Sequence, residues 1–145
     1  MIGADTTFLV QLEIAELPAN PAAHALLHRE IIVPGAPLVL APQVLGEFIH
    51  IVTDQRRFQR PMSMAEAIAK AHYWWNAQEV RQVFPDRLST DLGLDWLSNH
   101  QLGRKRILDT QLAATLWSSG VRRIVTSNPD DFAIFGLETL SPLLK

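Results

Sequence analysis

Short apolar runs alternate with longer stretches whose apolar residues recur at helical spacing, and this alternation restricts the folds open to the 145-residue chain. The runs at residues 1–4, 38–41, 80–84 and 124–126 are typical of strands, and residues 138–140 favour a short last strand. Because helical stretches separate the strands, we expect a mainly parallel sheet covered by helices, which makes the chain an α/β protein.

The helical stretches have recognisable beginnings and ends. We expect helices over residues 6–17 and 21–30, from Pro42 past Ile51, from Ser63 through Trp75, over 90–100, and from Asp109 to near Gly120. Proline is favoured at a first helical position and serine at an N-cap, which suits Pro42 and Ser63. Trp74 and Trp75 point to different sides of any helix, so one can pack inward while the other serves a subunit contact.

The composition indicates an ordinary compact protein. Hydrophobic residues make up 48% and charged residues 19%, and we expect one domain over residues 1–145. Cysteine is absent, which excludes disulfides, thiolate zinc sites and a cysteine nucleophile. The first residues carry no basic leader, and no long uncharged apolar stretch follows them. We therefore expect a soluble, cytoplasmic protein without a membrane partner.

A formal charge of −2 argues against a chain coated with basic residues for general nucleic-acid binding. Two local basic patches remain, one formed by Arg56, Arg57 and Arg60 and the other by residues 104–106. Either patch can neutralise phosphates near an acidic pocket, or it can be an ordinary solvated face.

Acidic residues follow or open the apolar runs at four separated places: Asp5, Glu47, Asp109 and the segment from Asn128 to Asp131. Asp5 and Asn128 follow two strands of the expected parallel sheet, and ligands bind such sheets outside the carboxyl ends of the strands. Carboxylates that converge repel one another, and a divalent cation relieves that repulsion most simply. A hard cation held by oxygen ligands is also what phosphodiester hydrolysis needs.

Four segments in order carry a resemblance to a known family: Asp5-Thr6, residues 45–48, residues 103–114 and residues 124–132. With these pieces the chain resembles a PIN-domain ribonuclease, and most of all the small VapC-type toxins of toxin–antitoxin pairs. The resemblance covers the chain from end to end. It implies a three-layer α/β/α fold with a central, mainly parallel sheet of four or five strands.

The resemblance also implies an activity and a set of partners. The activity is endonucleolytic RNA cleavage dependent on Mg²⁺ or Mn²⁺, with one or two ions bound. The partners are the RNA substrate, a cognate antitoxin and a second copy of the chain in a homodimer. Carried over by position, Asp5, Glu47, Asp109 and Asp131 are the catalytic acids, and Asn128 joins them as a metal ligand. Thr6, Arg104 and Lys105 become candidate substrate-binding residues.

Asn128 departs from the family pattern, because many relatives have aspartate there. Its amide oxygen still suits a hard cation, but the site loses a charge, which weakens the case for a second ion. Asp131 can take over part of the role. Asp130 fits less well, since the matched aspartate directly precedes Phe132.

Each candidate has a simpler structural explanation. Asp5 and Asp109 can cap helices, Glu47 can be an exposed helix residue, and Asn128 with Asp131 can form a turn. Thr6 can merely fill a helix. His24 and His28 have a zinc-compatible spacing without a third ligand, and surface positions explain the histidines better. The alternative function is a weak or inactive PIN-like domain that only binds RNA or protein.

Overall fold

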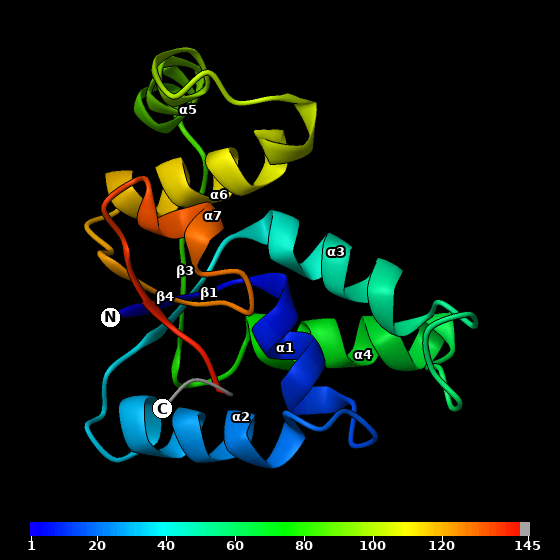
Figure 1. Cartoon of the computed structure of the whole chain (residues 1–145). Helices are drawn as coiled ribbons and strands as arrows, with labels where there is room; N and C mark the ends of the chain where they lie inside the picture. The colour runs from blue at the N-terminus through cyan, green and yellow to red at the C-terminus, as the bar shows by residue number, and fades with distance from the viewer. Residues whose placement is uncertain (143–145) are drawn as a thin grey trace.

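The computed structural model describes residues 1–142 as a five-stranded sheet with helices on both faces (Figure 1). The strands are β1 (Ile2–Ala4), β2 (Leu38–Leu40), β3 (Val80–Gln82), β4 (Arg123–Val125) and β5 (Glu138–Leu140). The helices are α1 (Thr6–Glu13), α2 (Asn20–Leu27), α3 (Pro42–Val52), α4 (Met64–Trp75), α5 (Arg87–Asn99), α6 (Ile107–Ser118) and α7 (Asp130–Ala133). A π-helical turn, η1 (His28–Ile32), extends α2, and a 3-10 turn, η2 (Arg104–Arg106), precedes α6.

The sheet confirms the expected topology. Its strand order is β3-β2-β1-β4-β5, and every neighbouring pair is parallel. Helices α1 to α4 form one packed group and α5 to α7 another, and the two groups are the outer layers of a three-layer α/β/α fold (Figure 1). β1 lies between β2 and β4, so β2 and β3 form one half of the sheet beside it, and β4 and β5 form the other.

The central strands form the core because both of their faces are covered. β1 and β2 are buried throughout, and Ile124 and Val125 of β4 are buried as well. Parallel strands covered on both faces read as continuous apolar runs, which is why these three were recognisable in the sequence. β3 and β5 form the edges and are more exposed.

Several predicted helix boundaries were wrong. α1 ends at Glu13 rather than at residue 17, and α5 begins at Arg87 rather than at residue 90. The start of α5 is fixed by Asp86, whose side chain accepts a hydrogen bond from the Ser89 N–H at 2.8 Å. The expected turn at residues 127–130 leads into the short helix α7.

Two expectations for α4 are confirmed. Ser63 is its N-cap and forms a capping box with Glu66. Trp74 packs inward, with 4% of its surface exposed, and its indole N–H donates to Glu13 at 3.0 Å. Trp75 is partly buried and packs edge-on against Phe84. Within residues 1–142, no helix combines the length and the apolar character that a bilayer span requires.

The close packing of α6 against β1 explains why position 3 of the first strand is a glycine. A Cβ built at Gly3 would lie 2.6 Å from a methyl carbon of Leu116, a fully buried residue of α6. The close approach of α6 to β1 therefore depends on the missing side chain.

We expect Gly3→Ala to lower the free energy of unfolding by about 1–3 kcal/mol, because the Leu116 side chain must move within a packed core. Gly46→Ala is the matched control, since a Cβ there meets no atom within 4 Å and alanine favours the α3 helix. Urea denaturation of both variants measures the effect. Equal stability of the two variants would contradict the proposed packing constraint.

Candidate active site

The carboxyl ends of β1 and β4 lie side by side and place the first two parts of the site together. Gly3 pairs with Ile124 and Ala4 with Val125, and the Asp5 N–H continues the ladder by donating to the Val125 carbonyl at 3.0 Å. Thr126 then donates its hydroxyl hydrogen to Asp5 Oδ2 at 2.8 Å. The neighbourhood expected from topology is therefore present at Asp5.

Asp5 is the most buried of the candidate acids, with 6% of its surface exposed. Its other oxygen accepts a hydrogen bond from the Thr6 N–H at 2.8 Å, so Asp5 also caps α1. Burial raises the pKa of Asp5, the bonds from Thr126 and Thr6 oppose that rise, and repulsion by Glu47 and Asp131 adds to it. Asp5 therefore both caps α1 and lies close to the other acids.

Glu47 approaches the site from α3 and is half-buried. The Thr6 hydroxyl donates to Glu47 Oε2 at 3.2 Å, so Thr6 is more than helix filler. Burial raises the pKa of Glu47, Thr6 lowers it, and repulsion by Asp109 raises it further. Pro42 begins α3, as expected, and the helix carries Glu47 over the end of the sheet.

Asp109 lies in the first turn of α6 but does not cap it, because the N-cap position belongs to Arg106. Burial raises the pKa of Asp109 to about 6, repulsion by Asp5 and Asp131 adds to the rise, and Arg106 opposes it. The capping explanation for Asp109 was therefore wrong. The raised pKa of Asp109 instead reflects its half-buried position close to other carboxylates.

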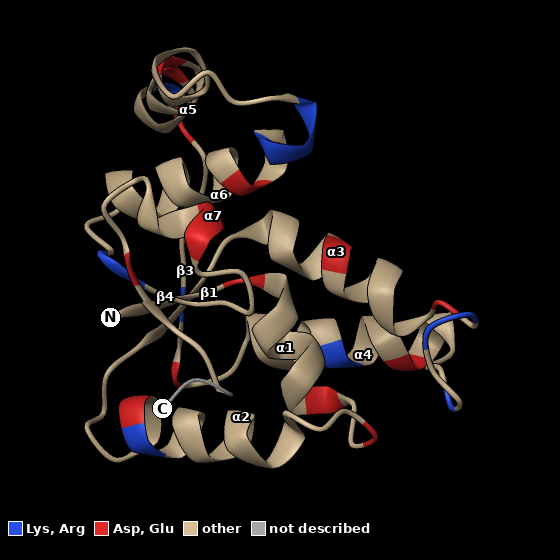
Figure 2. Ribbon diagram, viewed as in Figure 1, with Lys and Arg blue, Asp and Glu red and all other residues tan. Residues whose placement is uncertain are grey.

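Asp131 reaches the same group from α7 and is paired with Arg106. Arg106 Nη1 lies 3.6 Å from Asp131 Oδ1, and Arg106 Nη2 donates to the Asp131 backbone carbonyl. Arg106 is thereby the cation of the site, although its Nε is buried and has no hydrogen-bond partner within residues 1–142. Figure 2 shows the acidic segments on α3, α6, α7 and at the start of α1.

The remaining candidates lie further from the carboxylates. Asn128 is exposed and is tied to the site by its backbone N–H, which donates to Thr126 Oγ1 at 3.0 Å. Arg104 and Lys105 are exposed in η2. Thr126 and Arg106 were not singled out from the sequence. The i to i+3 spacing of Arg106 and Asp109 was the available signal, because it places both on one side of a helical turn.

The donor set suits a hard cation, since it consists of oxygens and its carboxylates repel one another. As the side chains are placed, however, no three His, Cys, Asp or Glu residues within residues 1–142 group closely enough to hold an ion. Asp5 is fixed by Thr126 and Asp131 by Arg106. Glu47 and Asp109 are half-exposed, so closing the group would require these two side chains to rotate, and Glu47 would then release its hydrogen bond from Thr6.

Comparison with known proteins identifies the fold. No protein-family model matches the sequence, and no curated protein matches it. Fourteen chains of solved structures match the fold, and three examples among them each match over nearly their whole length. VapC20 from Mycobacterium tuberculosis has a TM-score of 0.72 at 19% identity, covering 94% of this chain and 96% of its own. FitAcB from Neisseria gonorrhoeae has a TM-score of 0.66 at 13% identity, and the match covers 98% of each chain. VapBC-1 from nontypeable Haemophilus influenzae has a TM-score of 0.65 at 17% identity, and the match covers 99% of this chain and 100% of its own.

The chain has a PIN-like fold. This confirms the fold implied by the four sequence segments. The TM-scores of 0.65–0.72 establish the shared fold, whereas sequence identities of 13–19% support no conclusion about activity. Within the PIN-like fold, the acids of four separate segments lie close enough to affect one another's pKa values.

The raised pKa of Asp109 has a consequence for stability. Its folded pKa is about 6 against an ordinary 3.8, so the folded protein retains a proton that the unfolded chain has released. The stabilisation is complete below about pH 4 and is lost as pH rises through about 6. In a chelating buffer, we expect the free energy of unfolding to fall across this window.

Urea denaturation of the wild type and of Asp109→Asn at several pH values measures this fall. The decline should be shallower in Asp109→Asn, because the substituted side chain cannot titrate. Asp95→Asn changes an exposed acid on α5 and should keep the wild-type slope. An unchanged slope in Asp109→Asn would show that another group causes the decline.

Proposed function

We propose that this protein is a metal-dependent endoribonuclease and the toxin of a toxin–antitoxin pair. The observation that carries the proposal is the convergence of Asp5, Glu47, Asp109 and Asp131 at the carboxyl end of a PIN-like sheet, where each acid affects another. Burying several like charges together is costly for a structure, and a role in binding Mg²⁺ or Mn²⁺ accounts for that cost.

The four carboxylates would hold one or two ions, with the Asn128 amide as a further oxygen ligand. A divalent cation there would supply positive charge to the attacked phosphate and make a bound water more acidic. Asp5 is the fixed member, because Thr126 and the helix cap orient both of its oxygens. Thr6 positions Glu47 through its hydroxyl.

The half-buried acids and the nearby cations have separate roles in the proposed hydrolysis. Glu47 and Asp109 serve as ligands of the cation, and their pKa values are raised by burial and by carboxylate repulsion that a bound cation would relieve. Arg106 lies beside Asp131 and limits the repulsion between that acid and an RNA phosphate. Arg104 and Lys105, exposed in the preceding turn, are suited to contact phosphates of the RNA.

The structural neighbours support the toxin part of the proposal. VapC20 is a toxin that cleaves the sarcin-ricin loop, and a FitAB structure similar to this chain holds a DNA fragment. We infer a cognate antitoxin that covers the acidic group, a homodimeric assembly and a cytoplasmic location.

A second candidate function is RNA or protein binding without cleavage. The pairing of Arg106 with Asp131 favours it, since this guanidinium already neutralises one of the four acids. The two candidates differ in a simple outcome. A nuclease requires the divalent cation and Asp5 for RNA cleavage, whereas a binding module produces no metal-dependent product.

We expect Asp5→Asn to lower the rate of RNA cleavage at least about 100-fold, because it removes a ligand charge from the centre of the group. The assay follows end-labelled RNA with Mg²⁺ or Mn²⁺ and with a chelator. Asp130→Asn is the matched control, since Asp130 is exposed beside Asp131 and should leave cleavage unchanged. Equal cleavage by Asp5→Asn and the wild type would contradict the proposed site.

Metal binding should also be visible without any substrate. We expect Mn²⁺ to raise the melting temperature, by a stabilisation of about 2.7 kcal/mol at a concentration 100-fold above the dissociation constant. Glu47→Gln should reduce this shift, while Asp130→Asn should retain it. Differential scanning fluorimetry over a Mn²⁺ series measures both variants. A shift of the same size in Glu47→Gln would remove Glu47 from the ligand set.

A further inference from the structure

A cavity of about 380 Å³ lies directly beside the proposed catalytic group. Thr7 of α1 and Ser127 of the loop after β4 form part of its wall. Thr7 is the neighbour of Thr6, and Ser127 follows Thr126, so the cavity and the carboxylates share two backbone segments. The Ser127 N–H donates to Thr7 Oγ1 at 3.1 Å and joins those segments. We call this space the α1 cavity.

The α1 cavity has an apolar floor and one aromatic wall. Val10, Leu17 and Ile51 supply aliphatic surface, and Phe58 supplies a ring. The volume lies in the range of small-ligand pockets, about 300–1,000 Å³. Exposed bases of single-stranded RNA commonly stack on aromatic side chains.

Three polar residues, Thr7, Gln11 and Ser127, also line the α1 cavity. Gln11 Nε2 donates to Ser127 Oγ at 2.8 Å, and Thr7 Oγ1 accepts from the Ser127 N–H. Both oxygens accept in these bonds, and within residues 1–142 neither hydroxyl donates to another group, so both hydroxyl hydrogens can donate to a ligand. Gln11 Oε1 is buried without a hydrogen-bond partner within residues 1–142. The two hydroxyl donors match the edge of a nucleobase better than an aliphatic side chain, and the covered Gln11 Oε1 would join them as an acceptor once the Gln11 side chain turns toward a bound base.

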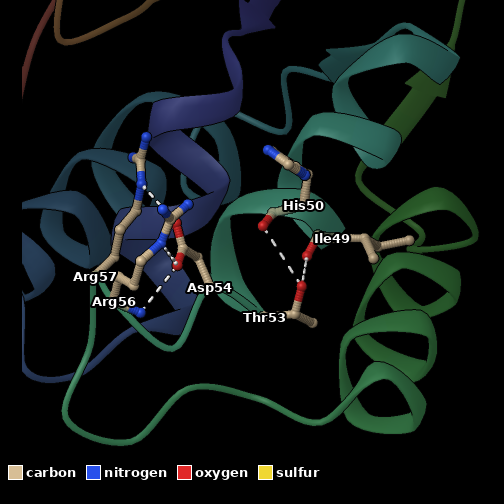
Figure 3. Close-up of polar contacts among 6 residues, drawn as sticks. All are labelled: Ile49, His50, Thr53, Asp54, Arg56 and Arg57. Atoms are coloured by element: carbon tan, nitrogen blue, oxygen red, sulfur yellow. Dashed lines mark hydrogen bonds and ion pairs between the residues drawn. The ribbon is translucent and has the colours of Figure 1, made fainter.

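The mouth of the α1 cavity is positively charged, in contrast to the carboxylate group. Asp54 lies between two arginines, 3.4 Å from Arg56 Nε and 3.5 Å from Arg57 Nε, and accepts from the Arg56 N–H at 2.9 Å (Figure 3). One carboxylate thus fixes the loop and faces two guanidinium groups. Arg57 lines the cavity and its side chain is 60% exposed, so it can contact a phosphate.

We propose that the α1 cavity binds one unpaired nucleobase of the RNA adjacent to the cleaved phosphodiester. The base stacks on Phe58, its edge meets Gln11 and Ser127, and Arg57 contacts the next phosphate. The cavity would then help to determine which RNA sequence is cleaved. This inference rests on the proposed nuclease function for its biological meaning, but nucleotide binding in the cavity is testable without cleavage.

The test is titration of the ¹⁵N-labelled protein with each of the four nucleoside 5′-monophosphates in a chelating buffer, followed by NMR. The Gln11 side-chain amide and the Ser127 backbone amide should shift for at least one nucleotide. Ribose 5-phosphate, which lacks the base, should leave the Gln11 amide unmoved. If ribose 5-phosphate produces the same shifts, or if no nucleotide moves these signals, the proposal is overturned.

Two variants separate the base contact from the phosphate contact. Phe58→Leu keeps an apolar side chain but removes the ring, so nucleotide affinity should fall about tenfold. Arg57→Gln should weaken the binding of nucleotides and of ribose 5-phosphate to a similar extent. Phe84→Leu, at an aromatic residue 57% exposed and packed on Trp75, is the control and should bind as the wild type does. Loss of binding in Phe84→Leu equal to that in Phe58→Leu would also overturn the proposal.

Cleavage then distinguishes this inference from the proposed function. An RNA with one abasic nucleotide beside its cleavage site should be cut more slowly by the wild type, and Phe58→Leu should cut intact and abasic RNA at similar rates. Absence of all cleavage, with nucleotide shifts present, would contradict the nuclease and retain the base site. Equal cleavage of both RNAs by the wild type would overturn the base site alone. The same conclusion would follow if the cavity bound a segment of an antitoxin but no nucleotide.

Discussion

Repulsion among carboxylates gathered at one end of the sheet is the constraint on which the rest of the site depends. Asp5, Glu47 and Asp109 all have raised pKa values, and burial is the first cause in each case. The free-energy cost of burying these carboxylates together is partly offset by the hydroxyls of Thr6 and Thr126 and by the guanidinium of Arg106. One internal cation facing four acids leaves an excess of negative charge, which favours an added cation.

The site has a fixed part and an adjustable part. Asp5 is buried and receives hydrogen bonds on both oxygens from the backbone of α1 and from the end of β4. Glu47 and Asp109 are half-exposed and lie on α3 and α6, which belong to opposite helical layers. The acids therefore converge from the end of the sheet and from both helical layers, and the two on α3 and α6 are exposed enough to rotate. The α1 cavity adds an apolar, positively rimmed surface next to this negative group.

The sequence allowed the sheet and the principal acids to be predicted, because both depend on local patterns. Strands buried on two faces are continuous apolar runs, and an acid directly after such a strand must lie at its carboxyl end. Asp5 after β1 follows from this rule alone. Glu47 and Asp109 needed the family resemblance as well, because nothing in α3 or α6 alone distinguishes a site residue from an exposed helix residue.

The contacts that adjust the site could not be predicted, because they join residues far apart in the chain. The bond from Thr126 to Asp5 spans 121 residues, and Arg106 appeared only as part of a basic run. The need for glycine at position 3 likewise depends on Leu116, which lies 113 residues further along the chain. Helix ends were missed where capping depended on one residue, as with Asp86 before α5.

The most direct test of the account is an anomalous-scattering map from a crystal soaked in Mn²⁺. The account predicts a peak at the carboxyl ends of β1 and β4, with oxygens of Asp5 and Asp109 about 2.1–2.2 Å from the ion and Glu47 rotated toward it. A map with no peak between these residues, or with manganese bound only elsewhere on the surface, would contradict the claim that the repelling carboxylates exist to hold a catalytic cation.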